Sequence, residues 1–266
     1  MNLRAAMVVG LCACHGSGSS SNPPPVDAPA APTDAPTGDG QITISADVSG
    51  TVSEQTTGHP IGSAQICAEG SDMCTTSASD GTYDFNVSLP EGMSLLDQVT
   101  TAAGYLGRET LLDENPGSNN DYQVFWQDFG GLYATGAATT LLATQAGFTY
   151  PSPTTGFVRV FVSGAGDDMV AATATISPSG GAGPVYTNAS GDPDPAVTDT
   201  STGGDFYFGN LPPGTYALTI QAAGMTCTSL DGGSTINGEW PPAGGETLRI
   251  HVSANAMTTG VGVECQ

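Results

Sequence analysis

Residues 205–220 read DFYFGNLPPGTYALTI and contain two short runs in which apolar side chains recur at every second position. Phe206 and Phe208 form the first run, and Tyr216, Leu218 and Ile220 form the second. A period of two places such side chains on one face of a β-strand. The Pro-Pro-Gly sequence between the runs is typical of a turn. The stretch therefore predicts two antiparallel strands joined by a tight turn, each with one buried face.

Similar runs occur along the chain from residue 41 onward, and their order repeats. Further alternating runs cover residues 42–48, 83–87, 172–176 and 248–252. The segments 50–52, 82–85, 89–92 and 102–105 match, in the same order, the segments 156–158, 205–208, 211–214 and 222–225. The second set carries an insertion, which we place within residues 177–204. Self-similarity at several landmarks indicates two copies of one β unit.

The first copy carries the series G-x-V, S-D-G-x-Y-x-F, L-P-x-G and A-G-Y, which resembles the carboxypeptidase regulatory-like domain. The second copy resembles the same family through F-G-N-L-P-P-G-T-Y. The resemblance implies a prealbumin-like (transthyretin-like) antiparallel β-sandwich for each copy, and a non-catalytic module of the kind appended to many proteins. We therefore expect an all-β fold with two prealbumin-like sandwiches.

The sequence divides into five predicted segments. A lipoprotein signal peptide covers residues 1–13, and a tether rich in Pro, Ala, Ser and Gly covers residues 14–40; its composition predicts disorder. The two regulatory-like domains cover residues 41–112 and 156–266, with a connector at residues 113–155. In the connector, Leu132, Ala138, Leu141 and Leu142 predict a short helix that ends at Gly147.

The N-terminus predicts a lipid anchor. A short basic start is followed by an apolar run and by Leu11-Cys12-Ala13-Cys14, which resembles a bacterial lipobox with Cys14 as the acceptor. The resemblance implies cleavage before Cys14 and attachment of lipid, with acyl chains such as palmitate, to its sulfur. An ordinary secretory signal is the alternative. Because His15 rather than Asp follows Cys14, the outer membrane is favoured over the inner one.

Composition excludes several classes of partner. The 266 residues include 26 Asp and Glu against 4 Lys and Arg, for a formal net charge of −22, and lysine is absent. Nucleic-acid binding relies on basic side chains that neutralise phosphates, so we expect no nucleic-acid partner. A charge this negative also resists self-association, which favours a monomer. Without lysine, a Lys–Asn or Lys–Asp isopeptide cross-link cannot form.

Four cysteines follow the tether, at positions 67, 74, 227 and 265. In an oxidising compartment they are expected to form disulfides. Four cysteines allow three pairings. One bridge in each domain, Cys67–Cys74 and Cys227–Cys265, is the most economical of them. Zinc is the alternative, but the Cys67-x₆-Cys74 spacing does not fit a zinc site.

The sequence offers no catalytic motif and no cofactor-binding motif, so we expect neither enzyme activity nor a cofactor. His59 and His251 are interpreted as exposed polar residues. No metal site is expected. The candidates for a calcium site are Asp192, Asp194 and Asp199 in the insertion, and the alternative is that they are solvated turn residues.

These features predict a non-catalytic, lipid-anchored protein of the cell envelope with a structural or protein-binding role. The alternative is a carbohydrate-binding surface module, because prealbumin-like sandwiches resemble starch-binding-type domains; Trp240 and Trp126 would then be the candidates for stacking on sugar rings. A third hypothesis is an adhesion-type protein stabilised by calcium. The expected partners are the membrane, through the N-terminal lipid, and a glycan or a surface protein.

Overall fold

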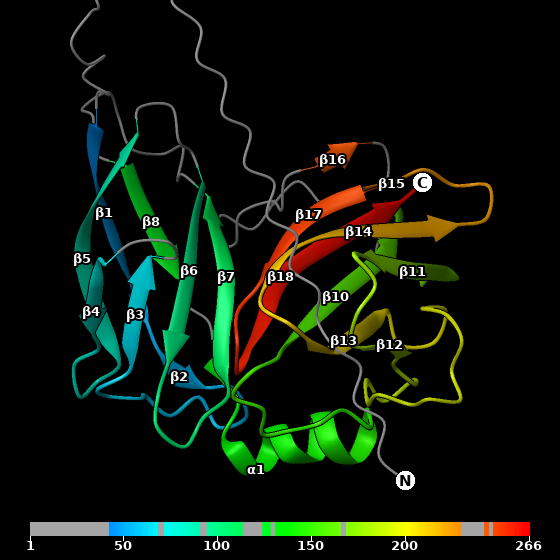
Figure 1. Ribbon diagram of the computed structural model, residues 1–266, viewed down its shortest axis with the longest axis horizontal. Coiled ribbons are helices and arrows are strands. Elements are labelled where there is room, and N and C mark those ends of the chain that lie inside the picture. Colours follow the sequence, from blue (N-terminus) through cyan, green and yellow to red (C-terminus); the bar gives the residue numbers. More distant parts are fainter. Residues whose placement is uncertain are drawn as a thin grey trace, which may run out of the picture. The chain divides into compact units, whose positions relative to one another are not determined.

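The computed structural model describes residues 43–68, 72–90, 95–113, 124–128, 131–165, 169–229, 242–244 and 247–266 (Figure 1). They fall within one compact unit, Gln41–Gln266. The fold is mostly β with one short helix, as the alternating runs predict. The predicted signal peptide, tether and lipid acceptor Cys14 lie outside the described residues.

The first sandwich is built around a three-stranded sheet in the order β5-β1-β8. It comprises β1 (Thr43–Thr51), β5 (Thr82–Pro90) and β8 (Val124–Asp128). The short strands β2 (Ser53–Glu54) and β9 (Gly131–Leu132) pair beside it. The core of this sandwich includes Val48, Val52, Tyr83 and Val87, together with Ile66 from the sheet that faces it.

A second, nine-stranded sheet extends through both sequence copies, in the order β12-β13-β10-β18-β7-β6-β3-β4, with β15 also paired to β18. The first copy supplies β3 (Gln65–Ala68), β4 (Cys74–Thr76), β6 (Leu95–Thr101) and β7 (Gly107–Asp113). The second supplies β10 (Gly156–Gly164), β12 (Ala182–Tyr186), β13 (Asp205–Leu211), β15 (Cys227–Ser229) and β18 (Ala256–Cys265).

The two copies meet where β7 and β18 pair in parallel, with Ala256 to Thr259 opposite Gly107 to Thr110. Figure 1 shows these two strands side by side. Duplicated β units are ordinarily expected to form separate domains that move relative to each other. Here main-chain hydrogen bonding continues from one copy into the other, which the sequence repeat does not predict.

The second sandwich is closed by a four-stranded sheet in the order β11-β14-β17-β16. It comprises β11 (Ala172–Ser177), β14 (Gly214–Ala222), β16 (Pro242–Gly244) and β17 (Thr247–Val252). Val158, Val160 and Val162 of β10 pack in its core with Phe206 and Phe208. Strands β13 and β14 are the two strands predicted from residues 205–220, although they belong to opposite sheets of the sandwich.

A short helix packs against the shared sheet on the face opposite that core. It comprises α1 (Thr135–Ala138) and a wider π-helical continuation, η1 (Thr139–Gln145). Gly147, at φ 74°, follows the helix, as predicted. Leu142 is fully buried in a cluster with Leu106, Phe157, Tyr207 and Met257. The cluster therefore joins β10, β13, β18 and the residue just before β7 beneath one helix.

The predicted connector contributes more than a helix. Strand β8 pairs with β1, and β9 pairs with β2, so residues 124–128 and 131–132 complete the first sandwich. Leu132 lies in β9 and in the core of that sandwich, not in the helix, where the spacing of apolar residues had placed it. An apolar residue just before a helix is difficult to assign from periodicity alone.

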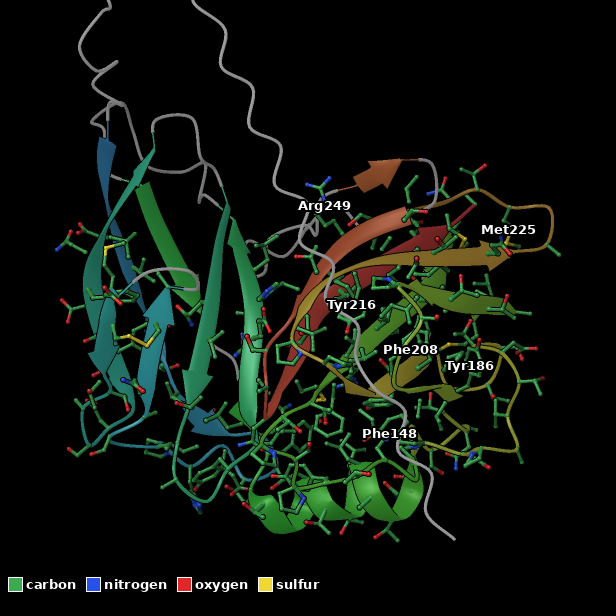
Figure 2. The ribbon with its side chains drawn as sticks, in the orientation of Figure 1. Phe148, Tyr186, Phe208, Tyr216, Met225 and Arg249 are labelled. Carbon is green, nitrogen blue, oxygen red and sulfur yellow. A yellow bond between two sulfur atoms is a disulfide. The ribbon has the colours of Figure 1, made fainter. Side chains whose placement is uncertain are left out.

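Two residues of the F-G-N-L-P-P-G motif, Gly209 and Asn210, contact the segment that follows the helix. A Cβ on Gly209 would lie 2.3 Å from the ring of Phe148, so only glycine leaves space for that ring. Asn210 has a φ of 58°, and its side-chain Oδ1 accepts a hydrogen bond of 2.8 Å from the backbone N–H of Thr149. Figure 2 shows Phe148 between the helix and the sheet. The motif therefore also docks the helical segment.

Candidate functional site

A buried polar cluster lies where the two sequence copies join. Glu109 is on β7 of the first copy, and its side chain is fully buried. Its Oε1 atom lies 2.5 Å from Nδ1 of His251 on β17 of the second copy. A buried carboxylate is costly unless it is paired and hydrogen-bonded, so His251 is a main source of stabilisation for this charge.

Thr258 of β18 completes the cluster. Its hydroxyl donates to the backbone oxygen of His251 at 2.6 Å and lies 3.4 Å from Oε2 of Glu109. On the neighbouring strand positions, Nε of Arg108 donates to Oγ1 of Thr259 at 3.1 Å. The cluster therefore links β7, β17 and β18 through side chains at the point where β7 and β18 also share main-chain pairing.

The interpretation of His251 as an exposed polar residue is wrong in its main point. His251 is on the outward face of β17, as the alternation predicts, but its imidazole is only 29% exposed and contacts Glu109. The partner is 142 positions away in sequence, and no local pattern indicates it. His59, by contrast, is exposed in its turn, as predicted.

A second ion pair lies on the helix-facing side of the shared sheet. Arg159 of β10 donates from Nε and a terminal nitrogen to the two carboxylate oxygens of Asp205 on β13, at 3.3 and 3.1 Å. Burial raises the pKa of the neighbouring Tyr207 hydroxyl well above its usual value, although the charge of Arg159 opposes the rise. Tyr207 therefore stays neutral. The charge-assisted hydrogen bonds between Arg159 and Asp205 hold β10 and β13 together, which is a structural role.

The two disulfides form with the expected pairings. Cys67 and Cys74 face each other across β3 and β4, and Cys227 and Cys265 face each other across β15 and β18. The second bridge attaches β15 to β18, which is the last strand of the chain and lies between β10 and β7 in the shared sheet. The backbone atoms of Thr226 and Gln266 also exchange hydrogen bonds, at 2.7 and 3.0 Å, just beyond the bridge.

The calcium candidates lie in the insertion and act as turn residues. Oδ1 of Asp194 accepts from the N–H of Ala196, and Oδ1 of Asp199 accepts from the N–H of Ser201. Hydrogen bonds from the hydroxyl and the backbone N–H of Ser201 lower the pKa of the Asp199 carboxyl. Asp192 lies in the preceding turn, where its N–H is 3.3 Å from Oδ1 of Asn188. Within the described residues, no group of three or more His, Cys, Asp or Glu side chains is placed to hold a metal ion.

The insertion also covers the edge of the second sandwich. Strand β11 is the last strand on its side of the four-stranded sheet. The hydroxyl of the fully buried Thr200 accepts a hydrogen bond of 3.0 Å from the N–H of Ala172 and donates one of 2.6 Å to the backbone oxygen of Val170. The Tyr186 hydroxyl accepts a hydrogen bond of 3.1 Å from the N–H of Ala174. Covered edges protect a sheet against pairing with other chains.

The candidates for sugar stacking are not tested by this geometry. Trp240 lies outside the described residues, and for Trp126 only the backbone, paired with Val48 in β1 and β8, is described. Among the residues that the structure does describe, no helix is long and apolar enough to cross a membrane.

Comparison with known proteins adds structural likenesses only. No family model and no curated protein matches the chain. Among solved structures, the minor pilin GBS52 of Streptococcus agalactiae is 12% identical, with a TM-score of 0.25, over 82% of this chain and 95% of that one. The shaft pilin SpaA of Lactobacillus rhamnosus GG is 9% identical, with a TM-score of 0.23, over 85% and 98%.

The Bacillus anthracis TIE protein is also similar, at 13% identity and a TM-score of 0.24 over 84% of this chain, which spans only 34% of that protein. Likenesses at these identities and TM-scores say nothing about function. The resemblance to carboxypeptidase regulatory-like domains thus continues to rest on the sequence motifs.

Proposed function

We propose that this chain is a non-catalytic structural protein of the cell envelope, in which two β-sandwiches act as one rigid body held to a membrane through lipid on Cys14. The observation that carries the proposal is the parallel pairing of β7 with β18, which makes one sheet of two sequence copies. Domains connected only by a linker move relative to each other. A continuous hydrogen-bonded sheet removes that freedom.

Three further features support rigidity at the junction. The helix-facing cluster packs Leu106, which immediately precedes β7, with Phe157 of β10 and Met257 of β18. The Glu109–His251 pair and the Arg108–Thr259 hydrogen bond add polar contacts across the same boundary. A rigid body of this kind suits a spacer or a platform that presents a binding surface, which is a structural or protein-binding role.

The envelope location rests on the lipobox-like sequence, with the outer membrane favoured because His15 follows Cys14. The strongly acidic composition, at −22, suits a solvated protein that does not self-associate. We include no activity in the proposal, since the polar clusters described are internally paired rather than directed at a shared reacting point.

Labelling with a palmitate analogue in a bacterial host tests the anchor. We expect the full chain to be labelled and to lose residues 1–13, because lipid is attached to the acceptor before cleavage. The Cys14→Ala variant should be neither labelled nor processed, while the matched control Cys12→Ala should behave as the wild type. Unlabelled wild type, or undiminished labelling of Cys14→Ala, would contradict the anchor.

A further inference from the structure

The strongest unexplained feature is the placement of a charged group inside the junction. Glu109 is fully buried in β7. This strand comes from the first sequence copy, but its residue Leu111 packs in the core of the second sandwich, so β7 contributes to both sandwiches. An apolar residue at position 109 would satisfy the alternation of β7 and avoid the cost of burying a carboxylate.

The partner of this carboxylate is the ionisable imidazole of His251, whose Nδ1 atom lies 2.5 Å from Oε1 of Glu109. Histidine is the side chain whose charge ordinarily changes between pH 5 and 8. A protonated imidazole forms an ion pair with the carboxylate, whereas a neutral one offers only a hydrogen bond between a charged and an uncharged group. The strength of the contact across the junction therefore depends on the proton of His251.

Other charged groups around the pair are few among the described side chains. On β17, Arg249 lies two positions from His251 on the same outward face and is exposed (Figure 2). On β7, Arg108 lies on the opposite face of the strand and bonds to Thr259. On β18, the nearest group is the neutral hydroxyl of Thr258. For Asp97 of β6 and Asp113 of β7, only the backbone is described.

We propose that Glu109 and His251 form a pH-sensitive latch between the two sandwiches, which is closed when His251 is protonated and loosened when His251 is neutral. The latch controls how often the β7–β18 pairing opens. It goes beyond the structural role proposed above and holds whether or not Cys14 carries lipid, so the two proposals succeed or fail separately.

The direction of the pH effect follows from the pairing. An ordinary histidine loses its proton near pH 6.5, and a neighbouring carboxylate favours the protonated form. A histidine that gains such a partner on folding contributes stability that is complete at lower pH and is lost as the pH rises through the titration of the folded state. The latch is therefore closed at low pH and loosens as the pH rises through the titration of His251.

Hydrogen exchange of the full chain at pH 5.5 and pH 8, corrected for the intrinsic effect of pH on exchange, tests the latch. We expect the amides paired between β7 and β18 to lose protection by about five- to tenfold at pH 8, because an ion pair is then replaced by a hydrogen bond between a charged and an uncharged group. Amides paired between β11 and β14 serve as the internal reference and should change less.

Two variants and a control make the result specific. His251→Gln retains a hydrogen-bond donor without a titrating charge, and we expect its β7–β18 protection to be independent of pH. Glu109→Gln should also abolish the pH response, and if it does not fold, His251→Gln alone decides. His59→Gln, in an exposed turn, should respond as the wild type does. A wild type without a β7–β18 pH response, or a His251→Gln variant that retains the response, would overturn the proposal.

Discussion

Replacing both Cys227 and Cys265 with alanine is expected to lower the free energy of unfolding by about 4 kcal/mol. The bridge closes a loop with a sequence separation of 38 and so removes much of the entropy of the unfolded chain. Both cysteines are also almost fully buried, and they attach β15 to β18, the strand at the centre of the junction. Urea denaturation of the two proteins measures the difference in the midpoint and in the free energy.

The matched control is the pair Cys67→Ala and Cys74→Ala. This bridge closes a loop with a sequence separation of only 7, at the β4 edge of the shared sheet, so we expect its removal to cost about 2.4 kcal/mol. If removing the short bridge destabilised the chain as much as removing the long one, the entropic account and the role assigned to β18 would both be wrong.

Phe157→Ala is expected to lower the free energy of unfolding by about 3–5 kcal/mol, the range found when a fully buried aromatic ring is truncated. The Phe157 ring is 0% exposed and lies 6.2 Å from the ring of Phe148 and 6.0 Å from that of Tyr150, measured between centroids. Removing it leaves a cavity between the helix and the shared sheet. Chemical denaturation followed by tryptophan fluorescence and circular dichroism measures the loss.

Phe161→Ala is the control for this change, since it removes the same side chain from the same strand. Phe161 is 37% exposed, so its truncation should cost about 1 kcal/mol or less. Equal losses for the two variants would mean that the helix-facing cluster is not a core of the molecule.

Much of the fold could be predicted from the sequence because it depends on local alternation. The residues that decide β11, β13, β14 and β17 alternate with a period of two, and the alternation correctly assigns Phe208, Ile220 and Ile250 to a core. The two disulfide pairings and the short helix before Gly147 also follow from spacing and from residue type. Each of these predictions needs only residues that are close in sequence, or cysteines.

The shared sheet and the buried cluster could not be predicted in the same way. Parallel pairing of β7 with β18 joins residues about 150 positions apart, and β-strands do not specify their partners by composition. Arg108 and Glu109 are adjacent charged residues within β7, but the sequence does not show that Glu109 is buried or that His251 and Thr258 are its partners. The resemblance to a single-domain module also favours two separate sandwiches over a fused pair.

Differential scanning calorimetry of the full chain tests whether the two sequence copies form one body through the shared sheet. We expect a single transition in which the calorimetric and van't Hoff enthalpies agree, because neither sandwich unfolds without breaking the β7–β18 pairing and the helix-facing cluster. Two resolved transitions, or a calorimetric enthalpy about twice the van't Hoff value, would show instead that the sandwiches unfold independently.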